Sequence, residues 1–271
     1  MSKKEGYREV LTGLMDEFLK TDNQEAIREY LASNSNLPGP RGNLELAYAF
    51  ADVAESYSAK HPKEMWAVAT GLAKVSASEA PANNPKELVP FCGALAIGAL
   101  GSAHEIFRQN AFAILKKLTY DSRWRTREGV AMGIQRLIAK QGQKTLKELD
   151  NWVMKNEWLA MRAIAAGVAE PALLKNEEIA KGAFALHKKI FAQVLDAGER
   201  KSAEFKTLRQ ALGYSLSVVV CAVPDEGFAY MRQIAKSHDA DVLWVLRENL
   251  KKNRLVKNFP AEVAVVKKLV S

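Results

Sequence analysis

Apolar residues recur along most of this chain at intervals of three and four positions, which is the spacing of one face of an α-helix. The first such face runs from Tyr7 through Leu11 and Leu14 to Phe18. No stretch alternates Val, Ile and Thr with polar residues for long enough to predict a strand. The pattern therefore predicts an all-α protein.

A succession of helices with short breaks is expected. Asp22 is the expected N-cap of a second helix, Asn43 caps a third, and Pro62 starts a fourth because proline is favoured in a first helical turn. The later helices are predicted at about 103–119, 122–140, 143–154, 156–169, 176–196, 201–221, 226–237, 240–250 and 260–270.

Aromatic residues recur at the starts of the later helices. Trp124 and Trp158 are each followed nine residues later by glycine, Trp244 opens a further copy, and Phe205 opens a weaker one. The starts lie 34, 47 and 39 residues apart. A period of this length with two helices in each unit is typical of an α-solenoid.

The copy that starts at Asp121 resembles the HEAT repeat. Its matching positions are Asp121, Arg127, Val130, Ala131 and Leu137, and Asp241 with Arg247 repeats the Asp–Arg spacing, whereas the Trp158 copy has Lys155 in place of the Asp. The resemblance implies a right-handed α-α superhelix in one domain over residues 1–271. Residues 1–100 would form an atypical N-terminal cap and residues 101–271 the repeats. It also implies that the Asp and Arg side chains link neighbouring repeats.

The size, basic character and tryptophan-rich helix starts are similar to those of the DNA alkylation-repair group of alkylpurine DNA glycosylases. That resemblance implies base-excision activity with a carboxylate beside tryptophans and with no metal or cofactor. Asp121, Asp239 and Asp241 lie near tryptophans, but each stands where a helix cap would. We therefore assign no catalytic residue.

The net charge of +8 is unevenly distributed. Residues 108–147 contain 10 Lys and Arg against 2 Asp and Glu, whereas residues 1–107 have a net charge of −4. A concentrated positive patch attracts polyanions. On the helix 122–140, Arg125, Arg136 and Lys140 share a face with Gly129 and Met132. The predicted nucleic-acid contacts are Arg123, Arg125, Arg136, Lys140 and Lys144; the alternatives are a solvated helix face or a surface for an acidic protein partner.

Two further sets of residues are candidates for binding. Trp124, Trp158, Arg162, Trp244 and Arg247 would line one groove if equivalent repeat positions face the same side, although such aromatics also fill the core between repeats. The loop Leu37–Asn43 places Arg41, Gly42 and Asn43 at a helix N-terminus, which suits an anion. It lacks the Lys-Ser/Thr of a phosphate-binding P-loop and is alternatively a rigid turn.

Other chemistry is poorly supported by the sequence. The four histidines are isolated, Cys92 and Cys221 lie in apolar surroundings, and Ser215 and Ser217 do not form a nucleophile elbow. No metal or cofactor is expected. Without a signal peptide or a long apolar run, a cytoplasmic protein is expected. The sequence favours a non-catalytic module whose basic concave surface binds DNA or another polyanion; the alternatives are a DNA glycosylase and a protein–protein scaffold.

Overall fold

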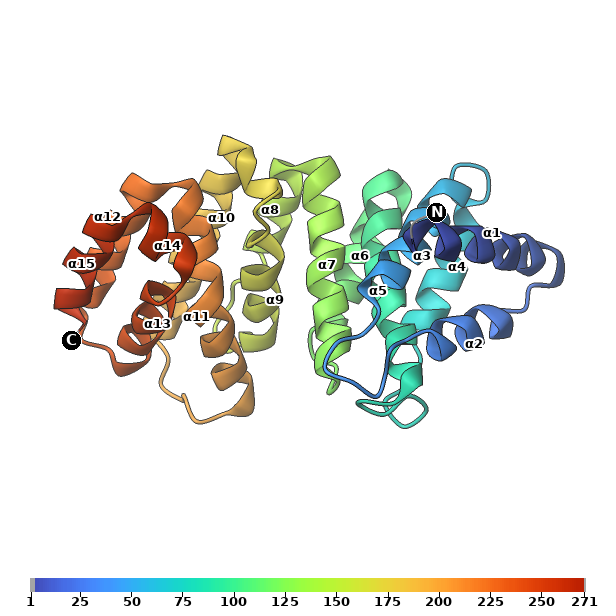
Figure 1. Cartoon of the computed structure of the whole chain (residues 1–271), viewed down its shortest axis with the longest axis horizontal. Helices are drawn as coiled ribbons and strands as arrows, with labels where there is room; N and C mark the ends of the chain where they lie inside the picture. Colours follow the sequence, from blue (N-terminus) through green and yellow to red (C-terminus); the bar gives the residue numbers. More distant parts are fainter. Residues whose placement is uncertain (1–2, 271) are drawn as a thin grey trace. The chain divides into compact units, whose positions relative to one another are not determined.

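The computed structural model describes residues 3–270, which fold entirely as helices joined by loops, with no strand in that range. The predicted all-α class is confirmed (Figure 1). The helices are α1 (Lys3–Thr21), α2 (Glu25–Ser33), α3 (Leu44–Tyr57), α4 (Pro62–Ala73), α5 (Leu88–Ala103), α6 (Glu105–Leu118), α7 (Trp124–Gln141), α8 (Gln143–Asp150), α9 (Trp158–Val168), α10 (Glu177–Leu195), α11 (Ala203–Ala222), α12 (Pro224–Ala235), α13 (Ala240–Leu250), α14 (Asn253–Asn258) and α15 (Pro260–Leu269). Two short 3₁₀ segments, η1 (Pro85–Glu87) and η2 (Leu173–Lys175), complete the set.

The chain divides into two compact units, Met1–Lys140 and Gln141–Ser271. The single solenoid domain over residues 1–271, with a cap over 1–100 and repeats over 101–271, stays a prediction.

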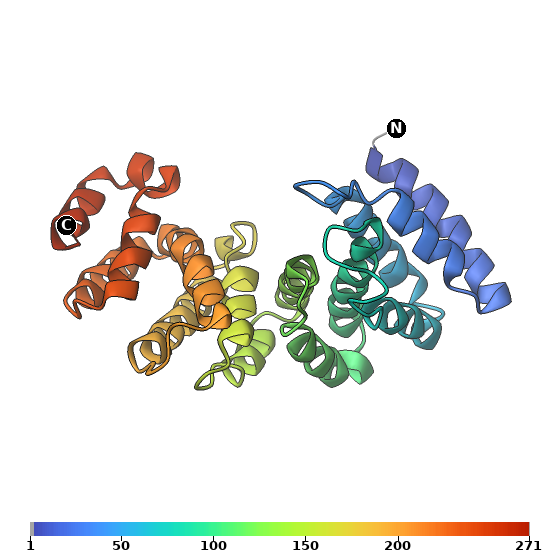
Figure 2. The same ribbon diagram turned by 90° about the horizontal axis from the view of Figure 1, so that it is seen from below.

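Unit 1 is built around α5, which packs against α3, α4 and α6, while α1 lies against α3 (Figure 2). Every residue of α5 from Leu88 to Ser102 is buried. A helix that is apolar on all sides must be covered on all sides, which explains its central place. The stretch Pro85–Ala103 is long and apolar enough to cross a membrane, but 89% of it is buried inside the protein, as expected of a core helix.

Glycines allow α5 and α7 to approach until their backbones touch. A Cβ added at Gly98 would overlap the backbone of Gly133, and one added at Gly129 would lie 2.7 Å from the carbonyl oxygen of Phe91. No residue larger than glycine fits such a contact without moving a backbone. This seam of Gly98, Gly129 and Gly133 fixes α7, and with it Trp124 at the start of that helix.

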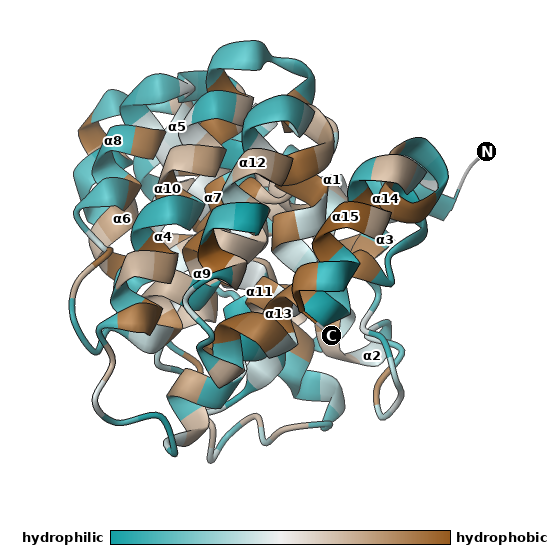
Figure 3. Ribbon diagram, turned by 90° about the vertical axis from the view of Figure 1, so that its left-hand side faces the viewer, coloured by the Kyte–Doolittle hydropathy of each residue, from teal (hydrophilic) through white to brown (hydrophobic). Residues whose placement is uncertain are grey.

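Unit 2 is built around α11, which packs against α9 and α13 and also contacts α10, α12 and α14 (Figure 1). In Figure 3 single helices of this unit carry both hydrophobic and hydrophilic segments, as amphipathic helices do. Two buried polar links join its core helices. His187 contacts the hydroxyl of Ser215 at 2.9 Å, and the Asn249 side chain accepts from the Ser217 N–H at 2.7 Å.

Several local predictions can be compared with the observed helices. Asn43 caps α3, because its side chain accepts from the Leu46 N–H, and Pro62 is the first residue of α4, both as predicted. The prediction for Asp22 was wrong. Its φ is +56°, and α2 begins at Glu25 after Gln24. The short helix α14 was not predicted.

Candidate functional site

A pocket of about 340 Å³ lies in unit 1 at the point where α7 begins. Trp124, Glu128 and Met132 of α7 form one side at four-residue intervals, which places them on one helix face. Leu88 and Phe91 of α5 lie in the pocket wall as well. The volume falls within the range of about 300–1,000 Å³ that is typical of small-ligand sites.

Arg41 and Gly42 of the loop before α3, with Leu44 at the start of α3, close the other side of this pocket. Two of the three predicted anion-loop residues are therefore brought to the pocket. Asn43 is not a ligand contact, because it is buried and its side-chain amide donates to the Tyr7 hydroxyl at 2.9 Å and to the Asn34 carbonyl oxygen at 2.8 Å. Its role is to hold the loop in place.

Trp124 supplies the exposed aromatic surface of the pocket. Trp124 is 46% exposed. The guanidinium of Arg125 lies 4.5 Å from the centroid of the indole ring. A tryptophan held by a cation–π contact and left half exposed is suited to stack on a planar ligand.

Arg125 supports the pocket from the inside, and its predicted role as an exposed phosphate contact was wrong. It is 6% exposed, and it donates to the Glu87 carboxylate at 2.8 Å and to the Gly39 carbonyl oxygen at 2.6 Å. Glu87 is itself fully buried and also accepts from the Asn83 N–H at 2.6 Å. This buried pair ties α7 to the loop and to η1.

Arg123 is likewise buried, so its predicted contact with nucleic acid was also wrong. It is 3% exposed and pairs with Asp121 at 2.6 Å. Its remaining donors reach the carbonyl oxygens of Val75 at 2.9 Å and Ala80 at 3.2 Å. The side chain therefore fastens the loop after α4 to the turn before α7.

The predicted basic stripe on α7 consists of Arg125, Arg136 and Lys140, and its outer part is neutralised by carboxylates of α3. Arg136 pairs with Asp52 at 2.5 Å and lies 3.9 Å from Glu55, and Lys140 also pairs with Glu55. Burial raises the pKa of Asp52, but hydrogen bonds from Lys4 and Arg136 outweigh it and leave the pKa below its usual value. Unpaired cations therefore do not follow this face of α7 as the sequence suggested.

Lys144 belongs to α8 in unit 2, where it is exposed and has no carboxylate partner among residues 3–270. It stays a predicted nucleic-acid contact.

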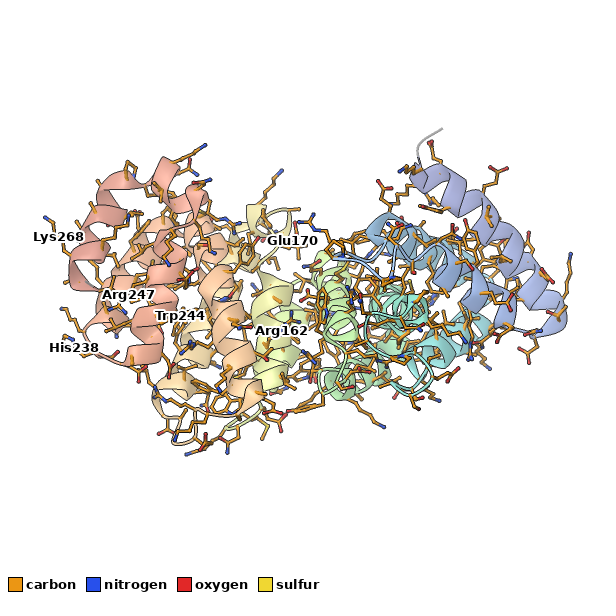
Figure 4. All side chains as sticks on the ribbon, turned by 60° about the horizontal axis from the view of Figure 1, so that its bottom comes forward. Arg162, Glu170, His238, Trp244, Arg247 and Lys268 are labelled. Carbon is orange, nitrogen blue, oxygen red and sulfur yellow. The ribbon has the colours of Figure 1, made fainter. Side chains whose placement is uncertain are left out.

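The predicted groove residues of unit 2 differ in their exposure. Figure 4 labels three of them, Arg162, Trp244 and Arg247. Trp158 is 5% exposed and packs edge-on against Phe205, with ring centroids 5.2 Å apart. Trp158 therefore fills the core, which was the alternative to a place in a binding groove. Trp244 is half-buried, and the Arg209 guanidinium lies 4.3 Å from its ring. Arg162 on α9 is also half-buried, whereas Arg247 on α13 is exposed.

The expected Asp–Arg links are made by other arginines. Asp241 pairs with Arg209 of the neighbouring helix α11 at 2.5 Å, and Arg247 donates to the Val270 carbonyl oxygen at 2.6 Å. In unit 1 the carboxylate of Asp121 binds Arg123, while Arg127 donates to the main-chain oxygen of Asp121 at 2.6 Å. One helix-to-helix Asp–Arg link is thus present in unit 2, with Arg209 in place of Arg247.

Sequence reasoning missed Glu128 as a pocket residue. It follows Trp124 by four positions, and this spacing could have placed the carboxylate and the indole on one helix face. Phe91 and Leu44 carry no comparable signal, because their part in the pocket depends on how distant segments pack. Among residues 3–270 there is no group of three or more His, Cys, Asp or Glu side chains that could hold a metal ion.

Comparison with known proteins adds no identification: no protein family matches the chain, and no similar characterised protein or solved structure was found. The interpretation of the pocket therefore depends on its own geometry.

Proposed function

We propose that this chain is a HEAT-like α-solenoid module, a right-handed α-α superhelix, that binds DNA or a related nucleic acid. The observation that carries the proposal is the pocket at the start of α7, where a half-exposed Trp124 stands beside the exposed Arg41. The recurring tryptophan helix starts and the Arg209–Asp241 link support the repeat architecture.

The pocket offers a nucleotide two kinds of contact. The half-exposed indole of Trp124 suits a base, and stacking on an aromatic residue contributes about 1–3 kcal/mol per base. Arg41 offers a guanidinium that can bind a phosphate through two parallel hydrogen bonds. Arg125 is not that contact, because it is buried and its Nη1 and Nη2 already donate to Glu87 and Gly39.

This proposal moves the principal contact from the basic stripe to the pocket. Arg136 and Lys140 are paired with acidic side chains, so releasing them to bind a phosphate would first break those ion pairs. A pocket that is already open requires no such step. The net positive charge of the chain then contributes to the approach of a polyanion more than to the specific contact.

A DNA glycosylase is the second candidate, and Glu128 is the observation that favours it. Its carboxylate lines the same pocket as Trp124. A carboxylate beside a bound nucleotide would stabilise the positive charge that develops on the sugar as the glycosidic bond breaks. The resemblance to alkylpurine DNA glycosylases implies this combination of carboxylate and tryptophan.

Fluorescence anisotropy with a labelled duplex, intact or carrying an abasic-site analogue, tests the proposal. Binding through phosphates should weaken by orders of magnitude between about 50 mM and about 200 mM salt. Trp124→Ala should lower affinity for the abasic duplex about tenfold, as expected for the loss of one base-stacking contact. The matched control is Tyr120→Ala, because Tyr120 is also aromatic, in unit 1 and 48% exposed.

Three results would decide between the candidates. Equal affinity of the Trp124→Ala and Tyr120→Ala variants would remove the pocket from the binding site. Release of a methylated base by the wild-type protein, lost in Glu128→Gln without loss of binding, would select the glycosylase. Failure to bind either duplex would leave the protein scaffold, whose acidic partner would then have to be sought.

A further inference from the structure

A second aromatic and cationic cluster lies in unit 2, where α11 meets the start of α14. It consists of Tyr214, Lys252 and Arg254. The Arg254 guanidinium lies 4.5 Å from the Tyr214 ring centroid and donates to the Tyr214 hydroxyl at 3.0 Å. The Lys252 ammonium lies 5.9 Å from the same ring. Tyr214 is nevertheless 47% exposed, so the cluster stands at the surface.

Arg254 differs from Arg200, Arg209 and Arg232 of unit 2, each of which has a carboxylate partner. Arg200 and Arg209 pair with Asp241, and Arg232 pairs with Glu262. Within the described residues Arg254 makes no ion pair, and its Nη1 is buried without a hydrogen-bond partner. A half-buried guanidinium with no counter-charge is an unfavourable arrangement that a bound anion would relieve.

The surrounding chain increases the positive potential at this cluster. Residues 247–257 contain five Lys and Arg but only one acidic residue, Glu248, which pairs with Lys251 at 2.5 Å. Lys252 and Arg254 therefore stand in a locally basic segment without ion pairs of their own. A ligand that fits must carry negative charge and present a surface that packs against an aromatic ring.

We propose that Tyr214, Lys252 and Arg254 form a contact for an unpaired nucleotide of a nucleic-acid strand. The phosphate lies against Lys252 and Arg254, and the base stacks on the exposed part of Tyr214. Only an unpaired base presents its face to a side chain at the protein surface, so the ligand is a single strand or an unpaired segment. This inference rests on the proposed function because it takes nucleic acid as the ligand. It does not require that the pocket of unit 1 binds that ligand.

The test measures binding of the full chain to a fluorescent oligothymidylate, to the corresponding duplex and to heparin, a polyanion without bases. The variant is Lys252→Gln with Arg254→Gln. The control is Lys175→Gln with Lys206→Gln, which removes the same charge from two exposed lysines of unit 2. We expect the first variant to lose about tenfold in single-strand affinity and its salt slope to fall by about 1.4, the value for two phosphate contacts.

Tyr214 separates stacking from charge alone. Tyr214→Ala should weaken single-strand binding several-fold and leave heparin binding unchanged, whereas Tyr214→Phe should retain most of the affinity because the ring remains. Circular dichroism of each variant establishes that it is folded.

The outcomes are distinct. If the double variant binds single strands as its control does, the cluster is not a contact. If Tyr214→Ala weakens heparin and single strands equally, or if it weakens duplex binding as much as single-strand binding, the base-stacking part is overturned. If Lys252→Gln with Arg254→Gln loses nucleic-acid binding and Trp124→Ala does not, the pocket of unit 1 is overturned as the binding site and the cluster is supported. If Trp124→Ala loses nucleic-acid binding and the double variant does not, the pocket is supported and the cluster is not a contact.

Discussion

Acidification should destabilise unit 2 through His187. This side chain is fully buried, and its Nδ1 and Nε2 lie 2.9 Å from the Ala183 carbonyl oxygen and the Ser215 hydroxyl. The carbonyl can only accept, so Nδ1 carries the proton and Nε2 accepts from Ser215. Burial lowers the pKa of His187 from 6.5 to about 4, although the hydrogen bond to Ala183 opposes the shift. The native state therefore holds a neutral imidazole.

The sign and size of the effect follow from that pKa. Between pH 6.5 and about 4 the unfolded chain takes up a proton that the native state does not. The stabilisation is thus fully present above pH 6.5 and is lost as the pH falls towards the native pKa. One pH unit corresponds to about 1.4 kcal/mol, so the whole span amounts to about 3 kcal/mol.

Urea unfolding over this pH range, with hydrogen exchange of α10 and α11 as a local measure, tests the prediction. His187→Gln is the matched variant, because an amide retains one donor and one acceptor but does not titrate. The wild-type free energy of unfolding should fall more steeply with decreasing pH than that of the variant, by about 2 kcal/mol between about pH 6.5 and about pH 5. Parallel pH profiles for the two proteins would refute the assignment of a neutral, buried His187.

Three other predictions concern packing and charge. Trp158→Ala should lower the free energy of unfolding by about 3–5 kcal/mol, because it removes a buried ring from the core; a loss below about 1 kcal/mol in urea titration would contradict the observed burial. Gly98→Ala should destabilise unit 1 by about 1–3 kcal/mol through overlap with Gly133, and an unchanged melting temperature would contradict the seam. Arg136→Gln with Lys140→Gln should change DNA affinity by no more than about twofold, since both cations are already paired; a tenfold loss in anisotropy would restore the basic stripe as a contact.

The helices could be predicted because their causes are local. Hydrophobic spacing predicted the elements, and Asn43 and Pro62 marked two helix starts. The failure at Asp22 is also local, since its positive φ belongs to a turn that the N-cap rule does not distinguish. The short α14 has too few residues for a periodic pattern to emerge.

The candidate site could be predicted only in part, because distant residues decide which side chains are available. Arg125 lies on a helix face that the sequence pattern predicts to be exposed. In the structure it is buried in an ion pair with Glu87, which stands 38 residues earlier in the chain. Arg136 is similarly paired with Asp52, 84 residues away. Trp124 and Trp158 occupy equivalent sequence positions, yet one is half exposed and the other is covered by Phe205. Repeat position alone therefore does not predict exposure.

The glycine seam between α5 and α7 has a consequence for the rate at which a ligand enters the pocket. Phe91, which lines the pocket, contacts the seam at Gly129, and Met132 precedes Gly133 in the chain. Backbones in direct contact cannot slide or rotate without collision, so the walls that α5 and α7 form are in place before a ligand arrives. Almost every molecule is then competent to bind, and no fraction of the affinity is lost to a closed state. Observed association rates should rise linearly with ligand concentration, without the plateau that a preceding conformational step imposes.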